Sequence, residues 1–368
     1  MTTTPERNPL SLSDIEDILA YIPHALGFHP TDSMVLLLVV GQRLEATMRV
    51  DLPEESLTDD QLDTWIRQVT NLTGQMPGIQ SIVSVLYVPQ VVRNESKDPY
   101  LRLIDRLAAQ LESLDIMLQH SWCVDAQFIW DYDQPDAQAL CARPVVDANS
   151  TNLSMVLAGS APLREPWDGC GIPEWPNAQD IRERAKELVE DKGAGLTRWA
   201  ELLNLPVERA LLYLHSDPDC AVELLRSLRW KIIRDLLPYL AGTDQDATQK
   251  ILRLLTEEKD QKAVPELSNF LLGRGWRSPD WQRTERLWAV SRDLLGVARG
   301  NQRYALMCVL AWIEWARGRG SLALTLLDQV LRECEDYNLA VLLKQLLNTG
   351  VMPHWATDQL RAWRAQFA

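Results

Sequence analysis

The N-terminal part of the chain carries apolar patterns that are typical of β-strands. Residues 34–40 are apolar at every position, as expected of a strand that is covered on both faces. In residues 43–52 apolar and polar side chains alternate, which predicts a strand with one buried and one polar face. Residues 81–88 form a third apolar stretch. We therefore expect a sheet whose first two strands are joined by a tight turn at residues 41–42.

Helical spacing precedes and separates these strands. Ser13 and Glu16 have the S-x-x-E spacing of a capping box and predict the start of a helix, which Gly27 ends in a left-handed conformation. Residues 59–72 and 98–114 predict two further helices.

The order of these elements predicts an α/β unit with a mixed sheet. The helix at 59–72 makes a crossover, which is expected to place residues 81–88 parallel to a neighbouring strand. Residues 116–132 hold more strand. Their periodicity fits equally well one long strand and a hairpin that turns near Asp125 and Ala126.

A segment rich in proline and glycine, residues 162–176, interrupts the regular patterns. Such a density of proline excludes a continuous helix or a central strand. Trp167 and Trp175 indicate that the segment packs along a domain surface, since large aromatic side chains tend to be buried. The domains that we expect are an α/β domain at residues 1–161, a linker at 162–177 and an all-α domain at 178–368.

From residue 178 onward the spacing of apolar residues is helical, with breaks at glycine and proline. Residues 305–320, 321–335 and 339–347 predict three antiparallel helices. They resemble one unit of a helix-pair repeat, although the chain shows no second copy at the expected spacing. The expected fold class is thus an α/β domain with a mixed sheet, followed by an all-α domain that resembles a helix-pair repeat.

Composition and charge narrow the function classes. The chain is 46% hydrophobic and 24% charged, as in folded globular proteins. Residues 1–150 hold 22 acidic and 9 basic side chains, whereas residues 151–368 hold 29 and 28. An acidic surface repels phosphate groups and anionic lipids, so nucleic acid is an unexpected partner and a membrane is not expected.

The spacing of the cysteines and the length of the apolar runs indicate the compartment of the protein and which cofactors to expect. The six cysteines are scattered and include no C-x-x-C pair, which argues against a zinc site and a disulfide framework. No apolar run approaches the about 20 residues of a membrane-spanning helix. Nucleotide and hydrolase fingerprints such as G-x-x-x-x-G-K-[ST] and G-x-S-x-G are absent from the sequence. We expect a cytoplasmic protein with no cofactor and no metal.

Two stretches resemble a known family. The run I-P-H-A-L-G-F-H-P-T-D-S-M-V at residues 22–35, followed by R-V-D-L-P at 49–53, is similar to the opening of the actinobacterial family called domain of unknown function 4192. Residues 304–355 resemble the helical end of that family. The resemblance implies an actinobacterial cytosol and supports the expected fold boundaries. It implies no activity.

The best candidate site from the residues is the polar loop at the entry to the first strand. His29, Asp32 and Ser33 gather an imidazole, a carboxylate and a hydroxyl there, and Arg49 and Asp51 on the second strand converge on them if the two strands pair. The simpler interpretation is structural: Asp32 or Ser33 bonds the amides of a turn, while Arg49 and Asp51 lie on a solvated strand face.

Arginines and tryptophans alternate along residues 274–319. This mixture occurs in proteins that bind single-stranded nucleic acid, but tryptophans at helical spacing also face a helical core. We favour the second interpretation, and expect Arg283 and Arg286 to lie on a surface that contacts a protein partner.

We expect a non-enzymatic adaptor or regulatory protein that acts through protein–protein contacts of its helical domain. The alternative is a small-molecule-binding or hydrolytic α/β domain that uses the loop of residues 29–33.

Overall fold

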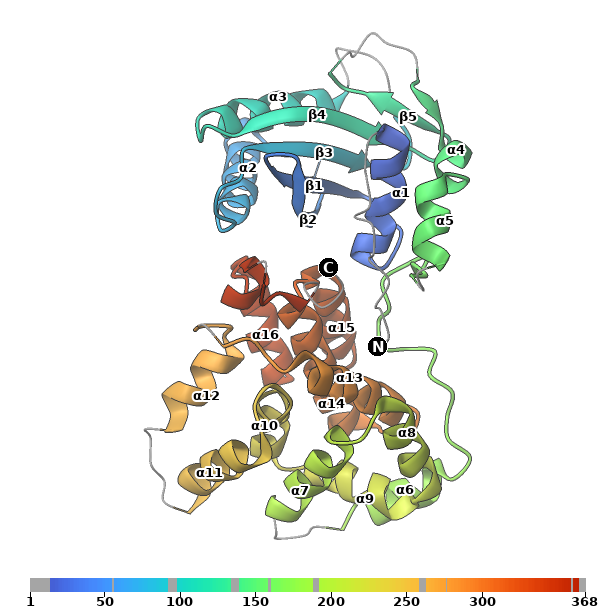
Figure 1. The fold of residues 1–368 in the computed structure, drawn as a ribbon, viewed down its shortest axis with the longest axis vertical. Helices are drawn as coiled ribbons and strands as arrows, with labels where there is room; N and C mark the ends of the chain where they lie inside the picture. The colour runs from blue at the N-terminus through green and yellow to red at the C-terminus, as the bar shows by residue number, and fades with distance from the viewer. Residues whose placement is uncertain are drawn as a thin grey trace, which may run out of the picture. The chain divides into compact units, whose positions relative to one another are not determined.

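Both strands and helices occur up to residue 157, and only helices follow in the part of the chain that the structure describes (Figure 1). The computed structural model describes residues 14–54, 56–91, 98–133, 139–157, 160–187, 192–257, 263–275, 277–358 and 360–363. The chain divides into two units between Pro166 and Trp167. The expected fold class, an α/β part with a mixed sheet followed by an all-helical part, is confirmed.

The sheet of the first unit has the order β2-β1-β3-β4-β5-β6. β1 pairs antiparallel with both β2 and β3, while β3 and β4 are parallel. β1 and β3 are the central apolar strands, and β3 is buried along its whole length. The strands are β1 (Ser33–Val40), β2 (Arg43–Asp51), β3 (Ser81–Tyr87), β4 (Met117–Val124), β5 (Phe128–Asp131) and β6 (Cys141–Ala142).

The sheet decides between the alternatives that the sequence left open. β4 and β5 form an antiparallel hairpin, so residues 116–132 are not one long strand. Asp125 builds the turn, because its Oδ1 accepts hydrogen bonds from the backbone N–H groups of Gln127 and Phe128, at 2.8 and 2.7 Å.

The expected alternation along β2 is interrupted. Leu38 of β1 pairs with Ala46, but the next residue, Val39, pairs with Leu44. Glu45 is therefore an extra residue in β2, and side chains before and after it do not follow one uninterrupted alternation.

Two groups of helices belong to the first unit (Figure 1). α2 and α3 pack against each other and connect successive strands, while α1 packs against α4 and α5. The structure gives the bounds α1 (Ile15–Leu26), α2 (Asp59–Thr73), α3 (Pro99–Glu112), α4 (Arg143–Asp147) and α5 (Ser150–Leu157).

The C-terminal end of α1 agrees with the end predicted from the sequence, whereas the N-terminal end does not test the predicted cap. Gly27 has φ 85° and donates its N–H to the carbonyl oxygen of Pro23, as predicted for a left-handed helix end. At the start, Asp14 is the N-cap and its side chain makes no capping hydrogen bond. Ser13, the expected cap, lies outside the described residues.

The proline-rich segment is held at both of its ends. The N–H of Leu163 donates to the carbonyl of Gly27, and the carbonyl of Leu163 accepts from the N–H of His29. Further along, Trp175 is 7% exposed within the helical unit and donates its N–H to the carbonyl of Gly296. The boundary between the two units, at residues 166–167, thus lies inside the linker expected at residues 162–177.

The helical unit is built around one helix. In α14 (Gly300–Ala316) every residue from 305 to 316 is buried. α13 and α15 pack along it, and α16 packs on α15, which agrees with the antiparallel helices expected at the C-terminal end. The other helices are α6 (Ala178–Arg184), α7 (Lys192–Leu203), α8 (Val207–Ser216), α9 (Pro218–Ser227), α10 (Lys231–Gly242), α11 (Gln245–Thr256), α12 (Ala263–Leu271), α13 (Trp281–Leu294), α15 (Gly320–Glu333), α16 (Asn338–Asn348) and the 3-10 turn His354–Thr357.

Candidate functional site

The structure brings part of the predicted loop site together. Ser33 lies opposite Asp51 in the pairing of β1 with β2. The guanidinium of Arg49 forms an ion pair with Asp51, with 2.7 Å between Nη1 and Oδ1. Its Nη2 donates a hydrogen bond to the carbonyl oxygen of Thr31 at 3.4 Å. Among the described residues, the buried Ser33 Oγ and Arg49 Nε have no hydrogen-bond partner.

The other two loop residues do not join this cluster. Asp32 is exposed and has φ 45°, and its carbonyl accepts a hydrogen bond from the N–H of Leu52. Aspartate tolerates the left-handed conformation that this turn requires. The backbone carbonyl of Asp32, and not its side chain, thus supports the pairing of β1 with β2.

His29 faces a different set of groups. It lines a small cavity of about 30 Å³ together with Tyr87, Arg143 and Asp147. Burial lowers the pKa of His29, the positive charge of Arg143 lowers it further, and Asp147 opposes this shift. A cavity of this size has room for about one water molecule and for no larger ligand.

Arg283 and Arg286, which we expect on a partner-contacting surface, are both half-buried on α13. Their guanidinium groups make hydrogen bonds within the helical unit. Arg283 donates to the carbonyl oxygen of Leu240 at 3.1 Å, and Arg286 donates to that of Leu203 at 2.9 Å. These carbonyls lie in the last turns of α10 and α7, where helices leave backbone acceptors without partners. The two arginines therefore cap helix ends, and burial lowers the pKa of Arg283.

The four described tryptophans of residues 274–319 pack in or against the helical core, and Trp288 is the partly buried one. Trp281, Trp312 and Trp315 are buried, and Trp276 lies outside the described residues.

Several arginines of the same region stack on indole rings within the unit. Arg317 lies 5.7 Å from the ring centre of Trp288 and 5.1 Å from that of Trp363, and Arg319 lies 4.4 Å from Trp363. Only 3% of the Arg317 side chain is exposed. Guanidinium and indole groups that would contact a nucleic acid are thus engaged internally.

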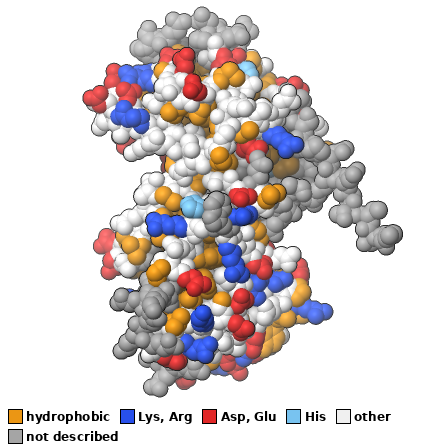
Figure 2. Space-filling view, turned by 60° about the vertical axis from the view of Figure 1, so that its left-hand side comes forward, with side chains coloured by type: hydrophobic (Ala, Val, Ile, Leu, Met, Phe, Trp, Pro, Cys, Tyr) orange, Lys and Arg blue, Asp and Glu red, His pale blue; other side chains and the backbone are white. Residues whose placement is uncertain are grey.

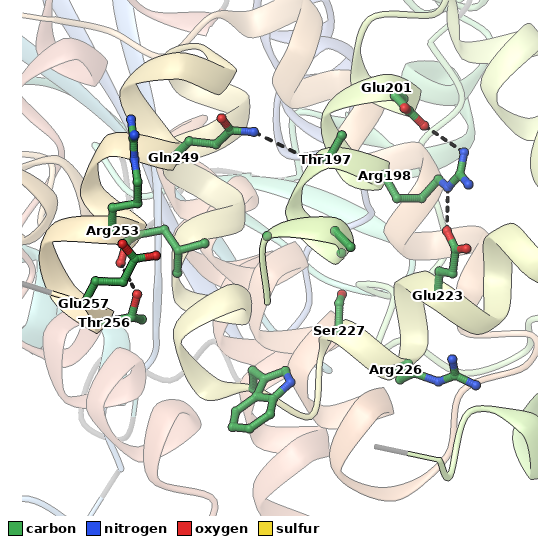
Figure 3. Close-up of a pocket in the computed structure, with 15 residues that line it drawn as sticks. Thr197, Arg198, Glu201, Glu223, Arg226, Ser227, Gln249, Arg253, Thr256 and Glu257 are labelled. Atoms are coloured by element: carbon green, nitrogen blue, oxygen red, sulfur yellow. Dashed lines mark hydrogen bonds and ion pairs between the residues drawn. The ribbon is translucent and has the colours of Figure 1, made fainter. Parts of the chain in front are cut away.

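A groove in the helical unit was not found by sequence reasoning. It has a volume of about 940 Å³ and lies between α7, α9 and α11, with the start of α10 beside them (Figure 3). Several of its lining residues are exposed, so the groove is open to solvent. The charged side chains that line it are Arg198, Glu201, Glu223, Arg226, Arg253 and Glu257.

Two of the groove arginines are held by neighbours. Arg198 donates from Nε to Glu223 at 2.7 Å and from a terminal nitrogen to Glu201 at 2.8 Å (Figure 3). The hydrogen bond to Glu223 raises the pKa of Arg198. Arg226 donates to the carbonyl oxygen of Arg184 at 2.7 Å.

Arg253 and Gln249 differ in how they are engaged. Arg253 is exposed, and among the described residues it forms no ion pair. Gln249 donates a hydrogen bond from Nε2 to Thr197 Oγ1 at 3.4 Å (Figure 3). The only sequence signal for this groove is the glycine pair at residues 193 and 195, because glycine marks close approaches of backbone.

Neither a metal-binding cluster nor a membrane-spanning helix occurs in the part of the chain that the structure describes. No three His, Cys, Asp or Glu side chains of the described ranges lie close enough together to share a metal ion. Within those ranges, no helix combines the length and the apolar character that crossing a membrane requires.

Comparison with known proteins identifies the family. No curated protein and no solved structure matches the chain at a significant level. A family model described as domain of unknown function (DUF4192) matches residues 16–167 and 174–354, which cover most of both units. The chain therefore belongs to the DUF4192 family.

Proposed function

We propose that this protein acts by binding, as a cytoplasmic adaptor or regulatory protein of an actinobacterium, and that its helical unit holds an extended segment of a protein partner. The groove between α7, α9 and α11 carries the proposal. Its volume of about 940 Å³ is large enough for several residues of an extended chain. The six cysteines all lie in the described residues, form no disulfide there and include three buried ones, which fits a reducing compartment.

The lining of the groove favours a peptide over a small molecule. Pockets for small molecules are mostly apolar and enclosed, with a few polar groups. This groove is open and lined largely by charged and amide side chains, with Trp230 and Leu252 as apolar contacts. An extended peptide presents backbone donors and acceptors along its length, which suits such a lining. Concave surfaces of stacked helices bind protein segments in the same way.

The charge of Arg253 indicates which charge the partner segment should carry. Arg198 is neutralised by Glu201 and Glu223, whereas Arg253 has no such counter-charge in the described structure. We therefore expect a partner segment with an acidic side chain beside Arg253.

The experiment compares two charge reversals on exposed arginines of the helical unit. Arg253→Glu changes the groove, and Arg209→Glu on α8 is the matched control outside it. Proteins that co-purify with the wild type and with each variant from the native host are quantified by mass spectrometry. One protein should fall about tenfold or more with Arg253→Glu, which corresponds to about 1.4 kcal/mol of binding, and should persist with Arg209→Glu. If every co-purified protein is recovered equally with the wild type, Arg253→Glu and Arg209→Glu, the groove is not the binding site.

The alternative, ligand binding or hydrolysis at the loop of residues 29–33, has less support. Arg49 forms an ion pair with Asp51, and Ser33 lies opposite Asp51 in the strand pairing, but His29 faces a cavity of about 30 Å³. No ligand larger than water fits that cavity.

A further inference from the structure

A serine, a histidine and an asparagine form a hydrogen-bonded chain in the α/β unit, and none of the predicted loop residues belongs to it. His24 on α1 is 6% exposed, and both of its ring nitrogens have partners. Its Nδ1 lies 2.8 Å from Ser160 Oγ, and its Nε2 lies 2.7 Å from Asn152 Oδ1. Asn152 belongs to α5, and Ser160 follows that helix.

The direction of each hydrogen bond follows from the neighbour of Asn152. The Nδ2 group of Asn152 donates to the carbonyl oxygen of Asp147 at 2.7 Å, and a carbonyl can only accept. This bond fixes Oδ1 toward His24, so Nε2 of the imidazole must carry the proton and donate to it. In the neutral ring Nδ1 then has a free electron pair, and it accepts the hydroxyl proton of Ser160.

The helices that carry these residues are themselves tied together. α1 and α5 pack against each other, and Thr151 Oγ1 donates to Asp17 at 2.8 Å. The imidazole is therefore held in place by packing on α1 and by Asn152, while Ser160 is half-buried. A nucleophile within hydrogen-bond reach of a base that a third group orients is the arrangement of an activated serine.

We propose that Ser160 is an activated nucleophile that accepts an acyl group from an activated ester or thioester. In this step Ser160 Oγ forms a bond to the acyl carbon while its proton moves to His24 Nδ1. The bond from the acyl carbon to the leaving oxygen or sulfur breaks, and the leaving group takes the proton from His24. The product is an ester on Ser160 and a free alcohol or thiol. Asn152 is a positioning residue, because it acts through His24.

The test uses the full-length protein and p-nitrophenyl acetate as acyl donor. Mass spectrometry should find one acetyl group on the peptide that contains Ser160, and Ser160→Ala should abolish this labelling. Ser154 is the matched control, since it is exposed and lies on α5 with its hydroxyl bonded to the carbonyl of Ser150. Ser154→Ala should leave the labelling rate unchanged.

Variants of Asn152 separate activation from mere folding. Asn152→Ala removes the group that fixes the imidazole tautomer, and the labelling rate should fall about tenfold or more. Asn152→Asp keeps an acceptor for Nε2 and should restore the rate. Circular dichroism verifies that each variant is folded. If the three groups only hold α1 against α5, Ser160 will react as slowly as Ser154. That result, or equal rates in the wild type and Asn152→Ala, would overturn the proposal.

Discussion

Gly195 of α7 lies directly against Ser227 of α9: a Cβ atom on Gly195 would stand 2.4 Å from the Cβ of Ser227. Gly195→Ala should therefore push the two helices apart and destabilise the helical unit by about 1–3 kcal/mol, the usual range for overpacking. Chemical denaturation measures this loss. Gly320→Ala is the control, because nothing lies within 4 Å of the added methyl group. Equal stability of Gly195→Ala and the wild type would show that α7 and α9 are not packed this closely.

Arg317 is the center of a buried charge network. It bonds Glu314 at 3.0 Å, and the two side chains are 3% and 5% exposed. Arg317→Met removes the nearer of two counter-charges of the buried Glu314 carboxylate and leaves only Arg319, at 3.7 Å, which should cost about 3 kcal/mol of unfolding free energy. The surface pair of Arg299 and Glu174 gives the contrast, and Arg299→Met should cost about 1 kcal/mol or less. Adding Glu314→Gln to Arg317→Met should recover part of the loss. A cost for Arg317→Met no larger than that for Arg299→Met would contradict a buried pair.

Burial of His29 predicts a dependence of stability on pH. The pKa of His29 is lowered from 6.5 by burial and by Arg143. The unfolded chain therefore binds a proton more readily than the folded chain. The stability that the neutral His29 side chain contributes is fully present above pH 6.5. It is lost as the pH falls from 6.5 toward the lower pKa that His29 has in the folded chain. His29→Gln should make the stability of the α/β unit less sensitive to pH in this window, as followed by denaturation at several pH values. An unchanged pH dependence in this variant would assign the effect to other groups.

The chain should be cleaved by trypsin after Arg164. Arg164 and Glu165 are exposed, whereas Leu163 is bonded to Gly27 and Trp175 is buried among helices. Cleavage there leaves the core of each unit intact, so residues 1–164 and 165–368 should survive as separate folded fragments. Limited proteolysis with mass spectrometry checks the site, and circular dichroism of the separately expressed halves checks their folding. Insoluble halves, together with an uncut chain, would show that the two units depend on each other.

The spacing of apolar residues predicted those strands and helices whose buried face repeats at a regular interval. The unbroken apolar run of β1 and the helical spacing of α2 predicted both elements, since a covered strand and an amphipathic helix each leave a distinct period. The extra residue at Glu45 left no such signal, because polar and apolar residues alternate through it in the sequence.

Contacts between distant residues could not be predicted from periodicity. His24 and Ser160 are 136 positions apart, so only the packing of α1 against α5 brings them together. The helical spacing of residues 281–294 likewise gave no sign that the long side chain of Arg283 reaches the end of α10. Long cationic side chains commonly bridge in this way, and a sequence does not show which carbonyl they reach.

The position of α14 has a consequence for synthesis of the protein. Residues 305–316 have no exposed face, so this helix gains its stability from neighbours on all sides. α15 and α16 leave the ribosome only after α14, while the α/β unit has long been complete. A nascent chain that has reached α14 can cover this helix with α10 and α13, but the faces that α15 and α16 will cover are still exposed to water. Exposed apolar surface of this kind favours aggregation, so we expect the chain to be most prone to aggregate before the last two helices are made.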